Sequence, residues 1–144
     1  MKYIQHILAT GLICLSALVP ATAHAAWEIN QNNIGFVISS NEPDYAFIAE
    51  LGGVYEVDFS DSCHESTYKP QNGTRTYNGQ AITFKTTCTN GNVAYQAATE
   101  AGRIWLGKEF AKATTVTVQG GRVYSAIGFS KVFITMHENA NSAL

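Results

Sequence analysis

Hydrophobic and polar residues alternate along much of the chain, and this two-residue period is typical of β-strands. In the segment 54–60, Tyr55, Val57 and Phe59 share one parity, whereas the acidic and hydroxyl side chains share the other. Residues 80–88 alternate in the same way. Similar patterns predict further strands at 27–30, 34–39, 45–51, 93–98, 115–119 and 122–127.

Short turn sequences separate these runs and predict that neighbouring strands pair antiparallel. Asn78-Gly79, Asn90-Gly91 and Gly120-Gly121 suit two-residue turns, which need residues that tolerate positive φ. Gly52-Gly53 is a fourth candidate turn. We therefore expect antiparallel neighbours within residues 45–60, 74–98 and 115–127.

One segment has a helical period. Thr99 is a suitable cap for a helix over residues 100–113, in which Leu106, Phe110 and Ala113 fall at i, i+4 and i+7. Gly102 and Gly107 weaken this helix. A second short helix is expected after Ser130. The pattern as a whole predicts a mainly β fold: one antiparallel domain of seven to nine strands, a sandwich or an open barrel, with one or two short helices.

The first 25 residues have the order of a cleavable secretory signal. Lys2 precedes an apolar stretch at 7–19, and small residues at 21–26 place the cut after Ala25. The apolar stretch has about 13 residues, whereas a membrane-spanning helix needs about 20, so no stable membrane anchor is expected. The sequence predicts an exported protein, periplasmic or secreted, from a Gram-negative bacterium, with a single domain at 26–138 and a frayed tail at 139–144.

Removal of 25 residues from the 144 leaves 119, which is enough for one core. Two cysteines remain, Cys63 and Cys88, and an isolated pair in an oxidising compartment predicts a disulfide. Cys63 shares the odd parity of Tyr55, Val57 and Phe59. If the alternation continues through residues 61 and 62, both cysteines face the core.

The charges are unevenly distributed along the chain. Residues 26–65 contain eight acids and no Lys or Arg, whereas residues 66–144 contain eight bases and three acids. The net charge after removal of the leader is therefore −3, which argues against a nucleic-acid binder.

The acidic segment contains a candidate binding face. With a turn at Gly52-Gly53, Ala49 is expected opposite Glu56 and Phe47 opposite Asp58, and one face of this hairpin then carries Tyr45, Phe47, Glu56 and Asp58. Acids next to aromatic rings suit a cationic protein partner, with the rings as anchors and the charge for steering. The alternative is that these acids pair with the basic second half of the same chain.

Catalytic and metal-binding motifs are weak by comparison. Residues 61–65, Asp-Ser-Cys-His-Glu, form the only dense set of possible ligands, and the chain has neither HExxH nor paired CxxC spacing. It also lacks a GxSxG elbow and a phosphate-binding glycine loop. We therefore expect no metal or cofactor and name no catalytic residue.

These observations favour a small exported binding protein without enzymatic activity, of the inhibitor or immunity kind, that engages a cationic protein partner. A first alternative is a small enzyme or accessory protein for cell-wall or polysaccharide material that uses Asp61, His64 or Glu65. A second alternative is a structural module for surface adhesion.

Overall fold

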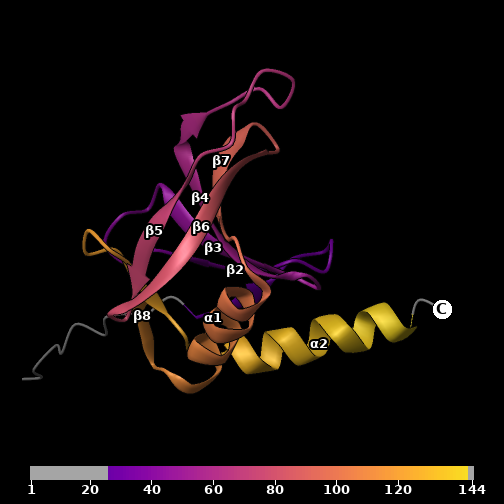
Figure 1. Ribbon diagram of the computed structural model, residues 1–144. Coiled ribbons are helices and arrows are strands. Elements are labelled where there is room, and N and C mark those ends of the chain that lie inside the picture. The colour runs from indigo at the N-terminus through magenta and orange to yellow at the C-terminus, as the bar shows by residue number, and fades with distance from the viewer. Residues whose placement is uncertain (1–25, 143–144) are drawn as a thin grey trace, which may run out of the picture.

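The computed structural model describes residues 26–142, so the predicted leader at 1–25 lies outside the described residues. Nine strands and two helices follow one another along this part of the chain (Figure 1). The elements are β1 (Glu28–Ile29), β2 (Gly35–Ile38), β3 (Tyr45–Glu50), β4 (Gly53–Ser62), β5 (Asn72–Tyr77), β6 (Gln80–Thr89), β7 (Asn92–Ala97), α1 (Glu100–Lys112), β8 (Thr115–Thr117), β9 (Val123–Ser125) and α2 (Phe129–Ser142).

The first seven strands form one antiparallel sheet in the order β1-β2-β3-β4-β7-β6-β5, and β8 and β9 form a separate hairpin. This hairpin forms hydrogen bonds near both edges of the sheet. The Asn78 N–H donates to the Thr117 carbonyl beside β5, and the Ser40 N–H donates to the Val123 carbonyl beyond β2. The strands therefore curl into a partly open barrel, and the predicted mainly β, antiparallel fold is confirmed.

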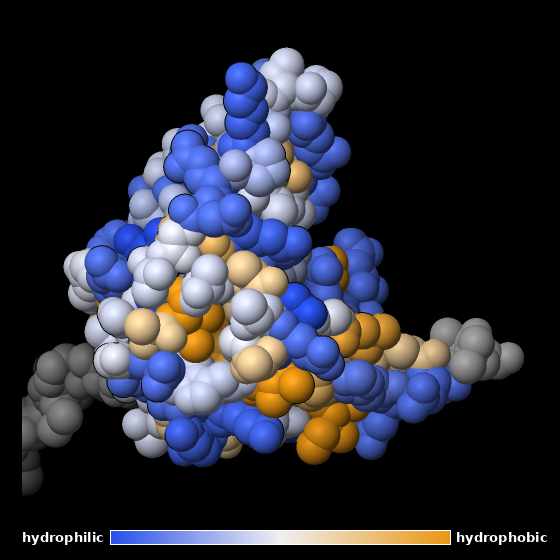
Figure 2. Space-filling model, viewed as in Figure 1, coloured by the Kyte–Doolittle hydropathy of each residue, from blue (hydrophilic) through white to orange (hydrophobic). Residues whose placement is uncertain are grey.

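The two ends of the barrel differ in what surrounds them (Figure 1). We call the end that carries α1 and α2 the helical end. The opposite end, called here the loop end, contains the segment 63–71 between β4 and β5 and the turn between β6 and β7. In Figure 2 the protruding loop end is mainly hydrophilic, while the strongest hydrophobic patches gather near the helices.

The glycine turns match the sequence in three of four cases. Asn78-Gly79 and Asn90-Gly91 adopt positive φ, as do Gly120 and Gly121. The fourth prediction was wrong by one residue, because Glu50 pairs with Gly53 and the turn is Leu51-Gly52. Consequently Phe47 lies opposite Glu56, and Tyr45 lies opposite Asp58. The four predicted face residues still share one face of the hairpin, since a shift of two positions preserves parity.

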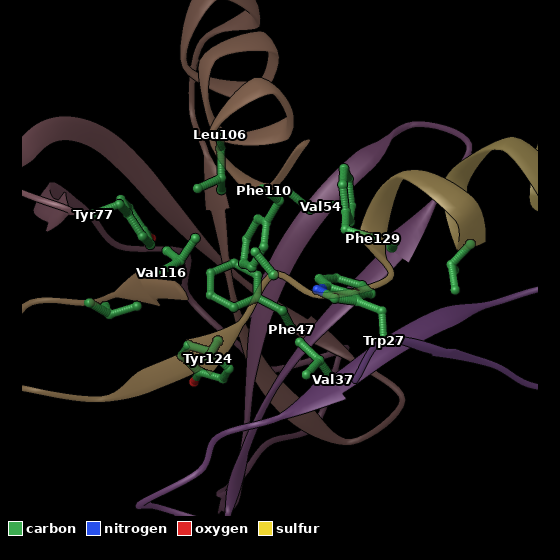
Figure 3. Close-up of a cluster of buried hydrophobic side chains, with 14 of the residues drawn as sticks. Trp27, Val37, Phe47, Val54, Tyr77, Leu106, Phe110, Val116, Tyr124 and Phe129 are labelled. Carbon is green, nitrogen blue, oxygen red and sulfur yellow. The ribbon is translucent and has the colours of Figure 1, made fainter. Parts of the chain in front are cut away.

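An aromatic-rich core, the larger of two buried hydrophobic clusters in residues 26–142, fills the helical end of the barrel (Figure 3). Phe47 is fully buried and meets Phe110 and Tyr124 edge-on, with ring centroids 4.8 and 4.7 Å apart. Trp27 packs between Phe110 and Phe129 at 5.2 and 4.9 Å. Such edge-to-face pairs add to the stabilisation that burial alone provides.

The helix α1 closes this end over the inner face of the sheet and follows the predicted range to within one residue. Its cap is Thr99, whose hydroxyl oxygen accepts a hydrogen bond of 3.1 Å from the Gly102 N–H. Gly102 is buried, and a Cβ there would lie 3.2 Å from Ile82 and 3.3 Å from Ala97. The glycine that weakens the helix thus allows it to pack closely on the sheet.

The second helix is longer than expected. α2 includes residues 139–142, which the sequence predicted as part of a frayed tail. A hydrogen bond of 2.9 Å from the Asn139 amide to the Asn33 side chain attaches this part of α2 to the turn after β1. Within residues 26–142, neither helix is long and apolar enough to cross a membrane.

The first half of β4 is buried on both faces. Tyr55 and Val57 pack with Ala94 in a small second cluster on the outer face, whereas the opposite face, which was expected to be polar and exposed, lines the barrel interior. Glu56 points into the barrel and is fully buried, whereas Phe59 on the outer face is 51% exposed. The pairing of β4 with β7 is irregular between Asp58 and Ser62, so the alternation does not continue to Cys63. This irregularity changes the parity and brings Cys63 to Cys88, with 5.9 Å between their Cα atoms. The predicted disulfide is therefore confirmed, although its parity argument was wrong.

Candidate functional site

Three charged residues meet inside the barrel, above the aromatic core. Glu56 on β4 forms ion pairs with Arg75 on β5 and with Arg122 just before β9, the latter at 2.8 Å. The Tyr124 hydroxyl also donates to the Glu56 carboxylate at 2.6 Å. Because each partner supplies N–H or O–H donors, the buried carboxylate is fully engaged.

Aromatic rings cover both arginines of this cluster. The Arg75 guanidinium carbon lies 3.8 Å from the Tyr95 ring centroid, and that of Arg122 lies 4.1 Å from the Tyr45 ring centroid. Burial lowers the pKa of Arg122, but the Glu56 carboxylate outweighs this effect and the pKa is raised. Burial, followed by the charge of Glu56, raises the pKa of Tyr124. Both groups therefore hold their protons firmly, as a structural ion cluster requires.

Asp58, two residues further along β4, is also buried but is held by local hydrogen bonds. Its Oδ1 accepts from the Ser60 N–H at 2.9 Å and from the Ser60 hydroxyl at 2.6 Å. Burial acts to raise the pKa of Asp58, but the hydrogen bonds from Ser60 and Tyr45 outweigh it and the pKa is lowered. Asp58 therefore remains ionised without an arginine beside it.

The predicted face of Tyr45, Phe47, Glu56 and Asp58 thus forms one wall of the barrel interior. Phe47 and Glu56 have no exposed surface, and Tyr45 is partly exposed. A partner reaches the two fully buried side chains only if the barrel opens. Glu56 instead joins arginines from the basic second half of the chain, which is the internal pairing that the sequence left as the alternative.

A hollow of about 540 Å³ lies at the loop end, next to the disulfide. Its floor is the inner face of β6 and β7, and its wall is the segment that follows β4. The lining combines three aromatic rings, several hydroxyl or amide groups and the side chains of one Asp, one His and one Lys. The lining residues are Asp61, Ser62, Cys63, His64, Thr67, Tyr68, Lys69, Gln71, Phe84, Thr86, Val93 and Tyr95.

This hollow brings together some of the residues that the sequence singled out. Asp61 and His64 both line it, whereas Glu65 and Asp58 do not. Over residues 26–142, no group of three or more His, Cys, Asp or Glu side chains is arranged to hold a metal ion.

The sequence pattern did not identify four residues that belong to the ion cluster or the hollow. Tyr95 and Tyr124 lie on strands that the pattern located, and Arg122 directly precedes one, whereas Arg75 lies on β5, which was not among the predicted strands. The partners of all four residues are more than 18 positions away along the chain. The one available signal was the opposite charge of the two halves of the chain, which indicated pairing but not which residues pair.

The chain matches no protein-family model, no curated protein and no solved structure at a significant level.

Proposed function

We propose that this protein is an exported binding protein without enzymatic activity, which occupies a cationic protein partner through its loop end. The Cys63–Cys88 disulfide supports the export component, because such bridges persist outside the reducing cytosol. The leader-like residues 1–25 support it independently.

The excess of exposed carboxylates at the loop end carries the proposal. In the segments 39–44 and 59–71, the exposed charged residues are Asp44, Asp61, Glu65 and one base, Lys69. Asp44 lies directly beside β4, since its carbonyl accepts a 2.8 Å hydrogen bond from the Phe59 N–H. The two arginines nearby do not offset these acids at the surface, because their guanidinium groups turn inward to Glu56.

The aromatic residues near these acids suit a lysine or arginine side chain. Phe59 is half exposed next to Asp44, and Tyr68 lines the hollow together with Asp61. A cation over an aromatic face is attracted to the ring, as Arg75 is to Tyr95 in this same region. The interface that we propose therefore uses exposed residues in place of Phe47 and Glu56.

Binding to labelled peptides tests this proposal. We expect a peptide rich in Lys and Arg to bind, a Glu-rich peptide of equal length to fail, and Asp44→Lys/Asp61→Lys to abolish the difference. Added salt should weaken the interaction, because screening acts on exposed charges. Glu28→Lys/Glu138→Lys is the matched control, since both acids are exposed at the helical end. Equal binding of both peptides would contradict the proposal.

A second candidate is an enzyme or accessory protein for cell-wall or polysaccharide material. The specific observation in its favour is that Asp61 and His64 share a concave hollow with Tyr68, Phe84 and Tyr95. Rings beside hydrogen-bonding side chains are a common surface for sugars. Retardation in gels that contain soluble polysaccharide or peptidoglycan fragments, abolished by Tyr68→Ala, would favour this candidate. Release of sugar fragments that depends on His64 and Asp61 would establish an enzyme.

A further inference from the structure

A groove of about 660 Å³ lies at the helical end, far from the hollow described above. It runs between α1 and α2 and is bounded by the turn between β3 and β4. Most of its lining is apolar, and Figure 2 shows hydrophobic patches in the region of the helices. The lining residues are Leu51, Gly52, Gly53, Val54, Glu100, Arg103, Ile104, Gly107, Lys108, Ala111, Phe129, Ser130, Phe133 and Ile134.

Three large aliphatic side chains in this groove are half exposed to solvent. Leu51 is 52% exposed, Ile104 50% and Ile134 57%, and they come from three different elements that meet at the groove. Single exposed aliphatic residues are common, but a contiguous apolar patch is typical of an interaction surface.

Gly107 has no packing role within the described chain. It sits inside α1, where glycine costs about 1 kcal/mol relative to alanine. Unlike Gly102, which contacts the sheet, Gly107 faces open space: a Cβ built there meets no atom within 4 Å. Gly107 and Ala111, one turn later, both line the groove beside α2, where the lack of bulky side chains leaves room for another backbone.

Two of the three charged residues that α1 contributes to this groove, Glu100 and Lys108, are arranged symmetrically about Ile104; the third is Arg103. Glu100, Ile104 and Lys108 fall at i, i+4 and i+8 and therefore form one row along the helix. The acid and the base are about 12 Å apart along the axis. Within the described part of the chain, neither makes an ion pair, since the ion pairs there involve other residues.

We infer that this face joins two copies of the chain in a two-fold symmetric dimer, with α1 of one copy antiparallel to α1 of the other. With the two-fold axis at Ile104, each Glu100 meets Lys108 of the second copy, and Gly107 lies opposite the small residue Ala101. A two-fold interface must be complementary to itself, and a row that reads acid, apolar, base has this property.

The charge pattern fits a second copy better than an unrelated ligand. An anionic amphipathic ligand would be attracted to Arg103 and Lys108 but repelled by Glu100. A cationic ligand would be attracted to Glu100 but repelled by the two bases. Two antiparallel copies form two Glu100–Lys108 ion pairs across the interface. The exposed apolar surface of Ile104, Leu51 and Ile134 is buried at the same time.

Sedimentation velocity of the exported protein over a range of concentrations is the test. We expect a monomer–dimer equilibrium that Ile104→Glu abolishes. Glu100→Lys and Lys108→Glu should each weaken the dimer by at least about tenfold, since each converts two attractive pairs into repulsive ones. The double variant should restore the dimer. Gly107→Leu should block it without loss of stability, because the space around this position is empty. Lys85→Glu, exposed on β6, is the matched control.

Cross-linking provides a second readout that needs no disruptive substitution. Ile104→Cys should give a disulfide-linked dimer in mild oxidant, because the axis brings this position against its own copy, whereas Lys85→Cys should not. A monomer at every concentration, a dimer unaffected by Ile104→Glu, or a charge swap that fails to restore association would each overturn the inference.

Discussion

The helical end and the loop end of this barrel contain the same strands but are stabilised by different interactions. At the helical end, Trp27, Phe47 and Phe110 pack ring against ring beneath α1. Towards the loop end, where neither helix of residues 26–142 covers the strands, the Glu56 cluster borders this aromatic core and the disulfide lies beyond it. An ion cluster and a covalent bridge therefore take the place of a hydrophobic core in the part of the barrel that the helices do not cover.

The largest effect is expected from Phe110→Ala at the helical end. Phe110 is buried and contacts Trp27, Phe47 and Phe129, so its removal leaves a cavity and costs about 4 kcal/mol of unfolding free energy. Urea denaturation measures this loss. Phe59→Ala, on the exposed outer face of β4, should change stability by about 0.5 kcal/mol or less. Equal losses for the two variants would show that the aromatic core is not what holds this end.

Loss of the disulfide should have the second-largest effect on the unfolding free energy. A bridge across a sequence separation of 25 residues restricts the unfolded chain by roughly 3.5 kcal/mol at 25 °C in the chain-entropy treatment. Cys63→Ser/Cys88→Ser should therefore lower the unfolding free energy by about that amount. Thiol titration of the protein without its first 25 residues, unfolded without reductant, should detect no free thiol. Two free thiols per chain would show that the loop end is held without the bridge.

Glu56→Gln should lower the unfolding free energy by about 3 kcal/mol, because it leaves two largely buried guanidinium groups without their carboxylate. The exposed Glu65→Gln serves as the control and should be close to neutral. If Glu56→Gln is neutral instead, the ion cluster does not stabilise the loop end. The triple variant with Arg75→Met and Arg122→Met separates lost pairing from lost packing, since it removes all three charges together.

The smallest stability effect concerns the Tyr124 hydroxyl. Tyr124→Phe removes one hydrogen bond to a charged acceptor and should cost about 2 kcal/mol at neutral pH. Because the pKa of Tyr124 is raised in the folded protein, its contribution is present below the unfolded value of about 10 and is lost as pH rises further. Above pH 10 the wild-type unfolding free energy should therefore fall more steeply with pH than that of Tyr124→Phe. Parallel pH profiles would contradict this assignment.

The sequence located most strands, three turns and α1, because these features depend on residues that are close in sequence. Asn78-Gly79 defines its own turn, and Thr99 caps its own helix. The orientation of β4 could not be predicted in this way. Alternation states that Tyr55 and Glu56 face opposite sides, but which side is interior depends on Arg75 and Arg122, 19 and 66 positions away. A buried acid cannot be distinguished from an exposed one by sequence pattern alone, because its burial depends on partners that are distant along the chain.

The candidate site was predictable only in part for the same reason. Asp61 and His64 stood out as polar residues next to a cysteine, and the disulfide fixes them at the loop end. Phe84 and Tyr95 come from β6 and β7, and only the strand order β4-β7-β6 brings them to the same hollow. The groove beside α1 depended on the position of α2, which local patterns do not specify.

The proposal that the loop end binds a cationic partner is tested most directly by association kinetics with a captured partner. Proteins that immobilised residues 26–144 retain from periplasmic or culture fractions would be identified by mass spectrometry and then measured singly. Asp61→Lys should slow association strongly at low salt and less at high salt, because screening already weakens the attraction there. Glu28→Lys, an equal charge change at the helical end, should leave the association rate unchanged. Equal association rates for the wild type and Asp61→Lys at low salt would show that the acidic loop end does not steer a cationic partner.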